Sequence, residues 1–430
     1  MREMKDSGIE WIGKIPAHWA LSKVGMFYNI VLGKMLQSEQ SSDSDTYEKY
    51  LCAMNLGNNA LKYDVLKKMW FSEKERQQYK VQKGDLIVVE GGDVASCDIV
   101  KEDVSDLYIQ NALHRVRAKK DFTLEFLRYS LMMAKAQGYI SLICNKATIA
   151  HFTKDKFSSL PFLAVPVDEQ LKIVQVLDKK CAQVDALITN IQTQIEKLKA
   201  YKQSMITEVV TKGLDPTVPM KDSGVEWIGE IPKHWSVIPS KFLFANCDER
   251  RREGDVQLTA SQKYGMISQE EYMRRENARI VLADKGLENW KHVEPFDFVI
   301  SLRSFQGGLE MSEVTGCATW HYIILRARQR IHPYYYKWLF KSSMYITTLQ
   351  RTCNYIRDGQ DLRYSNFVKV PLCIPTLYEQ QKIADFLDRK CAKIDHLITL
   401  KQSKIEKLEQ YKRSLIYEYV TGKREVSCDE

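Results

Sequence analysis

The sequence predicts an α+β protein in which two globular mixed α/β domains are joined by two long antiparallel coiled-coil helices. Three observations support this duplicated arrangement. A short Trp-rich segment occurs twice, a long heptad-patterned segment occurs twice, and a different domain-sized stretch lies between them each time. The chain has 430 residues, which is enough for two or three packed cores.

The shorter repeat reads MKDSGIEWIGKIPAHW at residues 4–19 and MKDSGVEWIGEIPKHW at residues 220–235, with thirteen of sixteen positions identical. It is too short for a domain. Its Trp, Ile and Pro residues predict an extended strap whose rings dock on a larger body. His18 and His234 recur within it, and either a ligand role or a structural role is conceivable. We expect the structural role, because neither has a neighbouring cluster of metal-ligating residues.

The longer repeat joins residues 169–211 to residues 379–421, with 25 of 43 positions identical. Apolar residues recur in both at alternating steps of three and four, which is the pattern of a coiled-coil seam. Both runs lack proline, and Gly213 and Gly422 follow where a helix C-terminus favours a left-handed residue. Two similar helices in one chain most simply pair with each other. Antiparallel pairing would relate the two halves by a pseudo-two-fold axis.

The predicted seam contains two matching lysines, Lys202 and Lys412. Two interpretations remain open: the ammonium groups extend to solvent at a frayed end, or they fix the register or meet an acidic partner. The interface residues expected along the seam are Leu177, Val184, Ile188, Ile195, Leu198, Lys202, Leu387, Ile394, Ile398, Ile405, Leu408 and Lys412.

The two stretches between the repeats are each the size of one domain. Their strand-like and helical runs predict a mixed α/β fold for both. Strands are expected at Leu86–Val89, Phe298–Leu302 and Tyr322–Leu325, and helices at Leu124–Lys135 and Pro333–Ser342. The predicted order is a strap over 1–19, a variable domain over 20–165, a central helix over 166–215, a linker with the second strap over 216–235, a second variable domain over 236–375, a C-terminal helix over 376–425 and a tail over 426–430.

The net charge of +8 lies in the variable stretches. Residues 20–165 hold 20 basic and 17 acidic side chains, and residues 236–378 hold 20 and 15. Within the second stretch, residues 303–369 hold 10 basic and 4 acidic side chains with tyrosines between them. Such a mixture suits phosphate contact and base reading. A solvated basic face is the alternative.

Candidate DNA contacts are the polar and glycine residues of the loops and strand ends in these stretches, since Arg suits guanine edges and Asn or Gln suits adenine edges. In the second domain they are Arg303, Gln306, Gly307, Arg351, Asn354, Arg357, Gln360 and Arg363. In the first domain they are Gly91, Gly92, Asn111, His114, Arg115, Asn145, Lys146, Thr148 and His151.

Several kinds of chemistry have no motif in this sequence. There is no G-x-x-x-x-G-K-[ST] loop, no H-E-x-x-H and no Pro-Pro pair, so no catalytic residue is predicted. The ten cysteines include no C-x-x-C, so no metal site is expected. No apolar run reaches the roughly 18–20 residues that span a bilayer, and the N-terminus lacks a secretory signal. We therefore expect a cytoplasmic protein with no membrane partner.

The combined pattern resembles the specificity subunit of Type I restriction–modification enzymes, over the whole chain. The straps SGIEWIGKIPAHW and SGVEWIGEIPKHW carry the resemblance, together with the two helices that begin with the pair Glu–Gln shortly after a proline. These pairs are Glu169–Gln170 after Pro166 and Glu379–Gln380 after Pro375.

The resemblance implies that each variable domain is a target-recognition domain for one half of a bipartite asymmetric site in double-stranded DNA. The helices would set the spacing between half-sites and dock two modification (methyltransferase) subunits, and motor-nuclease restriction subunits would join that core. S-adenosylmethionine, ATP and Mg would be held by these partners, with no cofactor in this chain. Two alternatives stay open: a coiled-coil scaffold protein without DNA binding, and a self-contained nuclease or methyltransferase.

Overall fold

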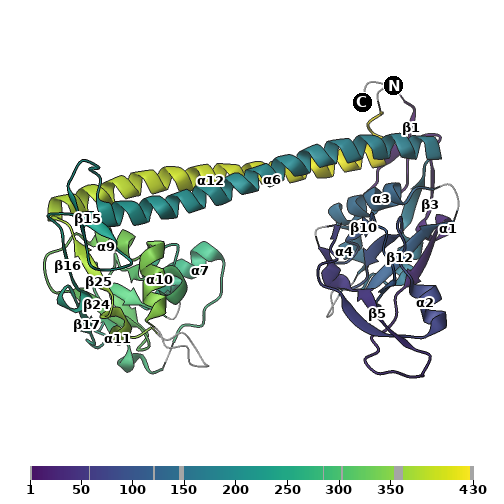
Figure 1. Cartoon of the computed structure of the whole chain (residues 1–430). Coiled ribbons are helices and arrows are strands. Elements are labelled where there is room, and N and C mark those ends of the chain that lie inside the picture. Colours follow the sequence, from purple (N-terminus) through teal and green to yellow (C-terminus); the bar gives the residue numbers. More distant parts are fainter. Residues whose placement is uncertain are drawn as a thin grey trace. The chain divides into compact units, whose positions relative to one another are not determined.

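The computed structural model describes residues 2–57, 59–119, 122–144, 150–283, 285–301, 304–352 and 362–426. The chain divides into two compact units (Figure 1). Unit 1 comprises Met1–Ile191 and Ser403–Glu430, and unit 2 comprises Gln192–Gln402. Each unit contains one strap, one variable domain and part of each long helix, so the duplication in the sequence corresponds to a duplication of structure.

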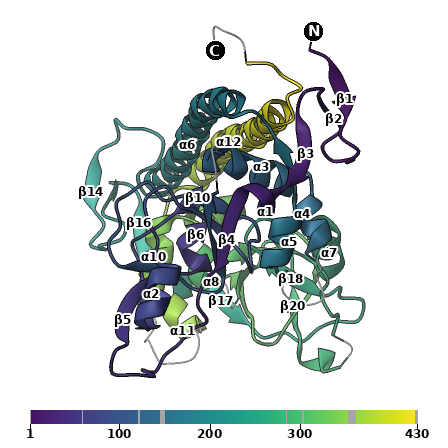
Figure 2. The same cartoon turned by 90° about the vertical axis from the view of Figure 1, so that its right-hand side faces the viewer.

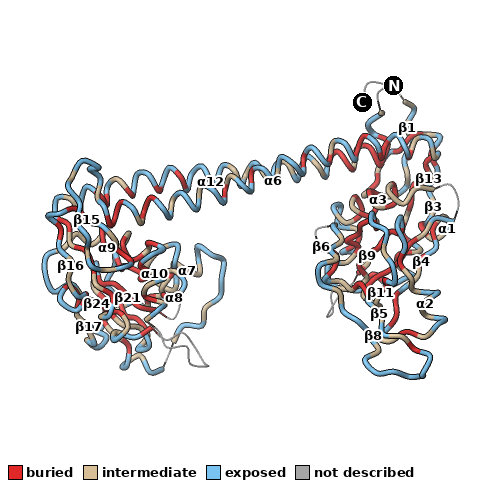
Figure 3. Tube along the Cα trace, in the orientation of Figure 1, coloured by how far each residue is buried: buried red, intermediate tan, exposed pale blue. Residues whose placement is uncertain are grey.

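The two long helices are α6 (Val167–Lys212) and α12 (Leu377–Val420). Gly213 directly follows α6 and Gly422 comes two residues after α12, and their φ angles of +80° and +68° are the left-handed conformation expected after a helix. Within each unit the two helices lie side by side (Figures 1 and 2), and buried and exposed residues alternate along both (Figure 3).

Most of the expected seam residues are protected from solvent. Leu177, Val184, Ile195, Leu387 and Ile394 are buried, and Ile188, Leu198, Ile398, Ile405 and Leu408 are half-buried. In unit 1, Lys412 Nζ lies 2.6 Å from Asp185 Oδ2 on the opposite helix. In unit 2, Lys202 Nζ lies 2.6 Å from Asp395 Oδ2. Of the two interpretations of these lysines, the structure supports the acidic pairing.

The straps dock their indole rings as expected. In unit 1 the strap forms the hairpin β1 (Met4–Asp6) and β2 (Lys14–Pro16), and Trp19 is fully buried. A Cβ added to Gly422 would lie 2.5 Å from Pro16 Cγ, so the strap packs directly on the end of α12. In unit 2 the hairpin is β14 (Met220–Asp222) and β15 (Glu230–Pro232), followed by the buried Trp235.

The first variable domain is built on a four-stranded antiparallel sheet. Its strand order is β10 (Cys97–Ile99), β9 (Leu86–Val89), β12 (Leu113–Ala118) and β4 (Tyr28–Leu32). Both faces are covered: Leu86 and Val88 pack in one apolar core with α3 (Leu124–Ala136), whereas Ile87 and Val89 pack in another. The other elements are β3 (Ala20–Lys23), α1 (Val24–Phe27), β5 (Thr46–Leu51), η1 (Ala53–Asn55), β6 (Leu56–Gly57), β7 (Ala60–Leu61), β8 (Lys67–Phe71), α2 (Glu73–Tyr79), β11 (Leu107–Ile109), α4 (Tyr139–Ile143), α5 (Lys154–Ser159) and β13 (Pro161–Ala164).

The second variable domain repeats this sheet. Its strand order is β22 (Glu310–Met311), β21 (Phe298–Ile300), β24 (Ile323–Ala327) and β17 (Phe244–Cys247), and α9 (Pro333–Leu339) follows in the place of α3. The other elements are β16 (Ser236–Pro239), η2 (Ser240–Phe242), β18 (Leu258–Ser261), β19 (Gly265–Ser268), α7 (Gln269–Glu276), η3 (Leu287–Asn289), β20 (Lys291–Val293), α8 (Ser304–Gly307), β23 (Gly316–Ala318), α10 (Ser343–Arg351), α11 (Tyr364–Phe367) and β25 (Pro371–Ile374). The predicted mixed α/β class is confirmed for both domains.

A matching ion pair shows that the two sheets are related. Arg117 donates from Nε and Nη2 to the carboxylate of Asp85, at 2.5 and 2.8 Å. Arg326 makes the same two contacts with Asp297, at 2.9 and 2.7 Å. Each aspartate comes just before the second strand of its sheet, and each arginine lies on the third strand. Two domains whose sequences do not align therefore share one topology and one buried-carboxylate brace.

Candidate nucleic-acid interface

The first residue of the Glu–Gln pair holds the strap to the helix. In unit 1, the Glu169 carboxylate lies 2.6 Å from His18 Nε2 and accepts a 3.1 Å hydrogen bond from Trp19 Nε1. Burial alone would raise the pKa of Glu169, but hydrogen bonds from His18, Arg2 and Trp19 outweigh it and keep this pKa below its ordinary value. The same contacts recur in unit 2 between Glu379, His234 (2.8 Å) and Trp235 (3.0 Å). Both histidines thus have the structural role expected of them.

The second residue of the pair holds the variable domain. Gln170 is fully buried; its Nε2 donates to the Val165 carbonyl at 2.7 Å, and its Oε1 accepts from Thr123 N and Oγ1, each at 3.1 Å. Thr123 is the N-cap residue of α3. In unit 2, Gln380 donates to the Pro375 carbonyl at 2.9 Å and accepts from His332 N, at the start of α9, at 2.8 Å.

A third constant residue meets a different donor in each domain. Asp178 accepts a 2.6 Å hydrogen bond from Tyr129 Oη on α3. Its repeat equivalent Asp388 accepts a 2.8 Å hydrogen bond from Trp338 Nε1 on α9. The long helices therefore present the same acceptors to two different domains, and each domain supplies its own aromatic donor. This is how one repeated frame holds two unlike inserts.

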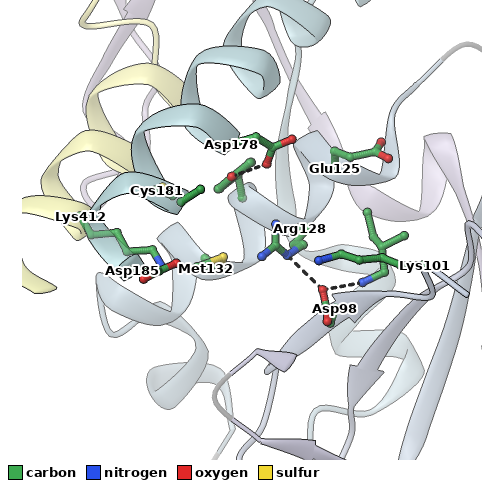
Figure 4. Close-up of a pocket in the computed structure, with 12 residues that line it drawn as sticks. Asp98, Lys101, Glu125, Arg128, Met132, Asp178, Cys181, Asp185 and Lys412 are labelled. Carbon is green, nitrogen blue, oxygen red and sulfur yellow. Dashed lines mark hydrogen bonds and ion pairs between the residues drawn. The ribbon is translucent and has the colours of Figure 1, made fainter. Parts of the chain in front are cut away.

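A cavity of about 420 Å³ lies at this junction in unit 1 (Figure 4). Its lining combines acidic and basic groups that face one another: Arg128 Nε is 3.7 Å from Asp98 Oδ1, and Lys412 pairs with Asp185. Opposite charges paired across a cavity are typical of a polar seam between a domain and its support. This cavity is therefore a feature of the junction between the first variable domain and the long helices.

Two segments of the first domain that were predicted separately lie together. Gly91 and His151 form a backbone bridge, and His151 Nδ1 lies 3.0 Å from Glu90 Oε2. A Cβ on Gly91 would be 3.5 Å from the His151 ring, whereas Gly92 has a φ of +98° and open space around it. We call residues 90–93 and 150–151 the first loop pair.

His114 and Arg115 do not support a direct DNA contact. His114 is fully buried and bonds the Phe152 carbonyl through Nε2 at 2.7 Å, and burial lowers its pKa. Arg115 is 6% exposed and donates to the Lys80 carbonyl at 2.6 Å. The physical reason is that this sheet is covered on both faces, so polar residues on β12 point into the two cores. Asn111 is half-buried, and its Oδ1 accepts from Gln110 Nε2 at 2.5 Å.

Three predicted contacts of the second domain are accessible. Gln306 on α8 is exposed, Arg351 at the end of α10 has a side chain 70% exposed, and Arg363 just before α11 is exposed. α8 and α10 contact each other, so Gln306 and Arg351 lie on neighbouring helices. Asn145, Lys146, Thr148, Arg303, Asn354, Arg357 and Gln360 lie outside the described residues.

Gly307 has a close-approach role that the sequence did not reveal. A Cβ there would lie 2.4 Å from the side-chain nitrogen of Gln262, so a side chain at this position would require the Gln262 side chain to move. The Gly307 carbonyl accepts a 2.9 Å hydrogen bond from Lys341 Nζ, which also pairs with Glu310. Sequence reasoning missed Gln262, Glu310 and Lys341, because none carries a local signal.

The comparisons with known proteins agree with the order of strap, variable domain and long helix described above. Residues 16–197 match the family of the type I restriction modification DNA specificity domain. The matching part of the chain contains the first variable domain and the first part of α6. A specificity subunit of type I restriction enzyme MjaVIII from Methanocaldococcus jannaschii is 23% identical over 229 residues, covering 53% of this chain and 49% of that protein. A putative MjaX specificity subunit from the same organism is 22% identical over 314 residues, covering 69% and 67%.

The family match is accompanied by a likeness of fold. The chain spans about half the length of the first of these relatives. A solved chain, reported under complex assembly and conformational transition of the type I R-M system, has a TM-score of 0.67 at 14% identity, covering 94% of this chain and 98% of that one. At this identity the likeness concerns the fold. In the part of the chain that the structure describes, no helix is long and apolar enough to cross a membrane.

Proposed function

We propose that this chain is a non-catalytic DNA-recognition subunit of a type I restriction–modification complex, in which each variable domain binds one half of a bipartite asymmetric site. One observation carries the proposal: a repeated frame holds two domains of the same topology with unlike sequences. Related folds with different surface residues suit two different half-sites, because sequence is read by side chains at base edges.

The loops that follow the second sheet strand and precede α5 or α11 are the proposed contact regions. In the first domain they include the first loop pair, where the open space around Gly92 leaves the backbone accessible to a base edge or phosphate. In the second they include Gln306, Arg351 and Arg363. The excess of basic groups in both domains would attract the phosphate backbone without selecting a sequence.

The long helices would set the distance between half-sites as one antiparallel coiled coil. Asp185 and Asp395 are repeat equivalents, as are Lys202 and Lys412, and each unit contains one Asp–Lys pair between the helices. A pseudo-two-fold coiled coil requires such equivalent contacts. The same two pairs would hold its register and therefore the spacer length.

Exchanging residues 20–165 for the corresponding domain of a relative tests this function. Co-expression with a modification subunit and genome-wide mapping of methylated adenine should show a split motif in which only one half changes. The retained second domain is the internal control, since its half-site must stay the same. Methylation at an unaltered motif, or at a motif changed in both halves, would contradict the proposal. A scaffold without DNA binding predicts no motif at all.

Two exposed apolar patches on the helices suit a pair of identical partner subunits. Leu187 and Tyr411 in unit 1 are each 50% exposed. Leu187 comes two residues after Asp185 and Tyr411 one residue before Lys412, so the ion pair places them at about the same level on adjacent helices. Their repeat equivalents Leu397 (46%) and Tyr201 (60%) flank the Asp395–Lys202 pair in unit 2 in the same way. Large apolar side chains on otherwise polar helices mark interaction surfaces.

We therefore propose that these patches dock two modification subunits, which would carry S-adenosylmethionine, and that motor-nuclease subunits with ATP and Mg join them. Native mass spectrometry of the co-expressed complex should show two modification subunits per chain. The double variant Leu187→Ser/Tyr411→Ser should retain one, and so should Tyr201→Ser/Leu397→Ser.

The matched control for docking is Lys197→Ser/Lys407→Ser, which changes exposed repeat-equivalent lysines of the same helices and should leave two subunits bound. All of these side chains are exposed, so the fold should persist. Two subunits retained by both patch variants would contradict docking at these patches, without contradicting DNA recognition.

A further inference from the structure

Three potential metal ligands converge on the second variable domain. Glu249 follows β17, His292 lies on β20 and Glu294 follows that strand. One side-chain ligand atom from each lies within 4.8 Å of the others. The segments are tied by a backbone hydrogen bond from His292 N to the Glu249 carbonyl at 2.8 Å. The three side chains are thus brought together by regular backbone pairing.

The histidine is held in the orientation that a metal ligand requires. His292 is 1% exposed, and its Nδ1 lies 2.8 Å from Oδ2 of Asp255, whose side chain is 5% exposed. A carboxylate at Nδ1 places the proton on that nitrogen and leaves a lone pair on Nε2. Nε2 is buried without a hydrogen-bond partner and lies 3.6 Å from Glu294 Oε1. A buried acceptor aimed at two carboxylates is a costly arrangement unless a cation lies between them.

Arg252 and Arg326 both pair with the carboxylates of the two glutamates. The two arginine side chains differ in how firmly other contacts hold them in place. Arg326 is fixed by its two hydrogen bonds to Asp297, and it approaches Glu249 and Glu294 only to 3.5 and 3.4 Å. Arg252 pairs with Glu249 at 2.5 Å, but its side chain is 53% exposed and can swing into solvent. Arg252 is therefore the displaceable cation of the cluster.

The charge balance leaves room for a divalent cation. Four carboxylates, those of Glu249, Glu294, Asp255 and Asp297, lie in or beside this cluster, whereas only two guanidinium groups, those of Arg252 and Arg326, pair with its glutamates. The formal sum is minus two, before Arg252 moves. Glu249 and Glu294 have side chains 36% and 38% exposed, so a hydrated ion has access from solvent.

We propose that Glu249, His292 and Glu294 bind one divalent transition-metal cation of the zinc type, with Asp255 positioning the histidine. One imidazole nitrogen and two carboxylate oxygens suit Zn²⁺ and similar ions, whereas Mg²⁺ and Ca²⁺ favour ligand sets made of oxygen alone. The bound ion would fasten the segment after β17 to β20, and would have water as its remaining ligand. None of its residues is among the proposed DNA contacts Gln306, Arg351 and Arg363.

Calorimetric titration of Zn²⁺ into the EDTA-treated full chain tests the site. We expect one binding event that Glu249→Gln and Glu294→Gln each weaken by at least about ten-fold. Glu253→Gln, an exposed change in the same segment, is the matched control and should bind like the unaltered chain. Arg252→Ala should bind several-fold more tightly, because it removes the competing guanidinium. Thermal melting without metal checks that each variant is folded.

Three results would overturn the site. The first is no binding up to millimolar Zn²⁺. The second is binding unchanged in both Gln variants, which would assign it to cysteines elsewhere. The third is an Arg252→Ala chain that binds no more tightly than the unaltered one, since the cluster would then be an ion-pair network only. None of these results bears on DNA recognition.

Discussion

Replacing Lys341 with Met is expected to lower the free energy of unfolding of unit 2 by about 3–5 kcal/mol. Lys341 Nζ donates to Glu310 Oε1 and, at 2.9 Å, to the Gly307 carbonyl. The Glu310 side chain is only 4% exposed, so the substitution leaves a buried carboxylate without a counter-charge. Burial raises the pKa of Glu310 and lowers that of Lys341, so each depends on the other to remain charged. Urea denaturation with hydrogen exchange of β22 peptides measures the loss.

The control for this substitution is Lys337→Met on α9. Lys337 is 38% exposed and lies 3.4 Å from the exposed Glu313, so the change should cost less than about 1 kcal/mol. The double variant Lys341→Met/Glu310→Leu should recover most of the loss, because an apolar pair can replace a buried ion pair. Equal destabilisation by Lys341→Met and Lys337→Met would contradict the role of Lys341 as the counter-charge of the buried Glu310. No recovery of stability in the double variant would contradict it as well.

The Lys341–Glu310 pair also bears on the proposed interface. Gly307 ends α8, and Gln306 beside it is a proposed DNA contact. Loss of the ammonium group removes the hydrogen bond that fixes this carbonyl, so faster exchange of α8 amides should accompany the loss of stability. A contact residue needs a fixed backbone to read a base edge.

The long helices and the straps were predictable because their signals are local. The heptad spacing, the absence of proline and the terminal Gly213 and Gly422 specify α6 and α12 without reference to any other segment. The shared sheet topology was not predictable from alignment, because strand pairs such as β9 with β12 join segments far apart in sequence. The two expected apolar strands, Leu86–Val89 in the first domain and Phe298–Leu302 in the second, do not specify their partner strands by themselves.

Of the candidate site, the sequence indicated which segments form loops but not that the polar residues of β12 are buried. The segments at Gly91 and His151 could be recognised as loops, because polar glycine-containing stretches at strand ends favour exposed loops. The structure shows that the two segments meet. The structure buries His114 and Arg115, which does not favour them as contacts, because strand alternation exposes every second residue only when one face of the sheet is free. The constant Glu–Gln pair could be recognised in the sequence, but its partners are set by tertiary contacts.

Replacing Gln380 with Leu is expected to destabilise unit 2 by about 3 kcal/mol. The side chain is 2% exposed, donates to the Pro375 carbonyl and accepts from His332 N. Leu leaves both backbone groups buried without a partner, at about 1–3 kcal/mol each. Urea unfolding gives the total, and hydrogen exchange should show the His332 amide opening more readily than in the unaltered chain.

The neighbouring residue supplies the matched control for Gln380→Leu. Gln381 is exposed, and its repeat equivalent in α6 is already a leucine, Leu171, so Gln381→Leu should change stability by less than about 0.5 kcal/mol. Gln170→Leu should have a comparable effect in unit 1, since it orphans Thr123 N, Thr123 Oγ1 and the Val165 carbonyl. A large effect at only one of the two glutamines would mean that the frame does not hold its two domains in the same way. The half-site exchange proposed for this chain depends on that equivalence, because a domain can be replaced only if the helix offers each insert the same anchor.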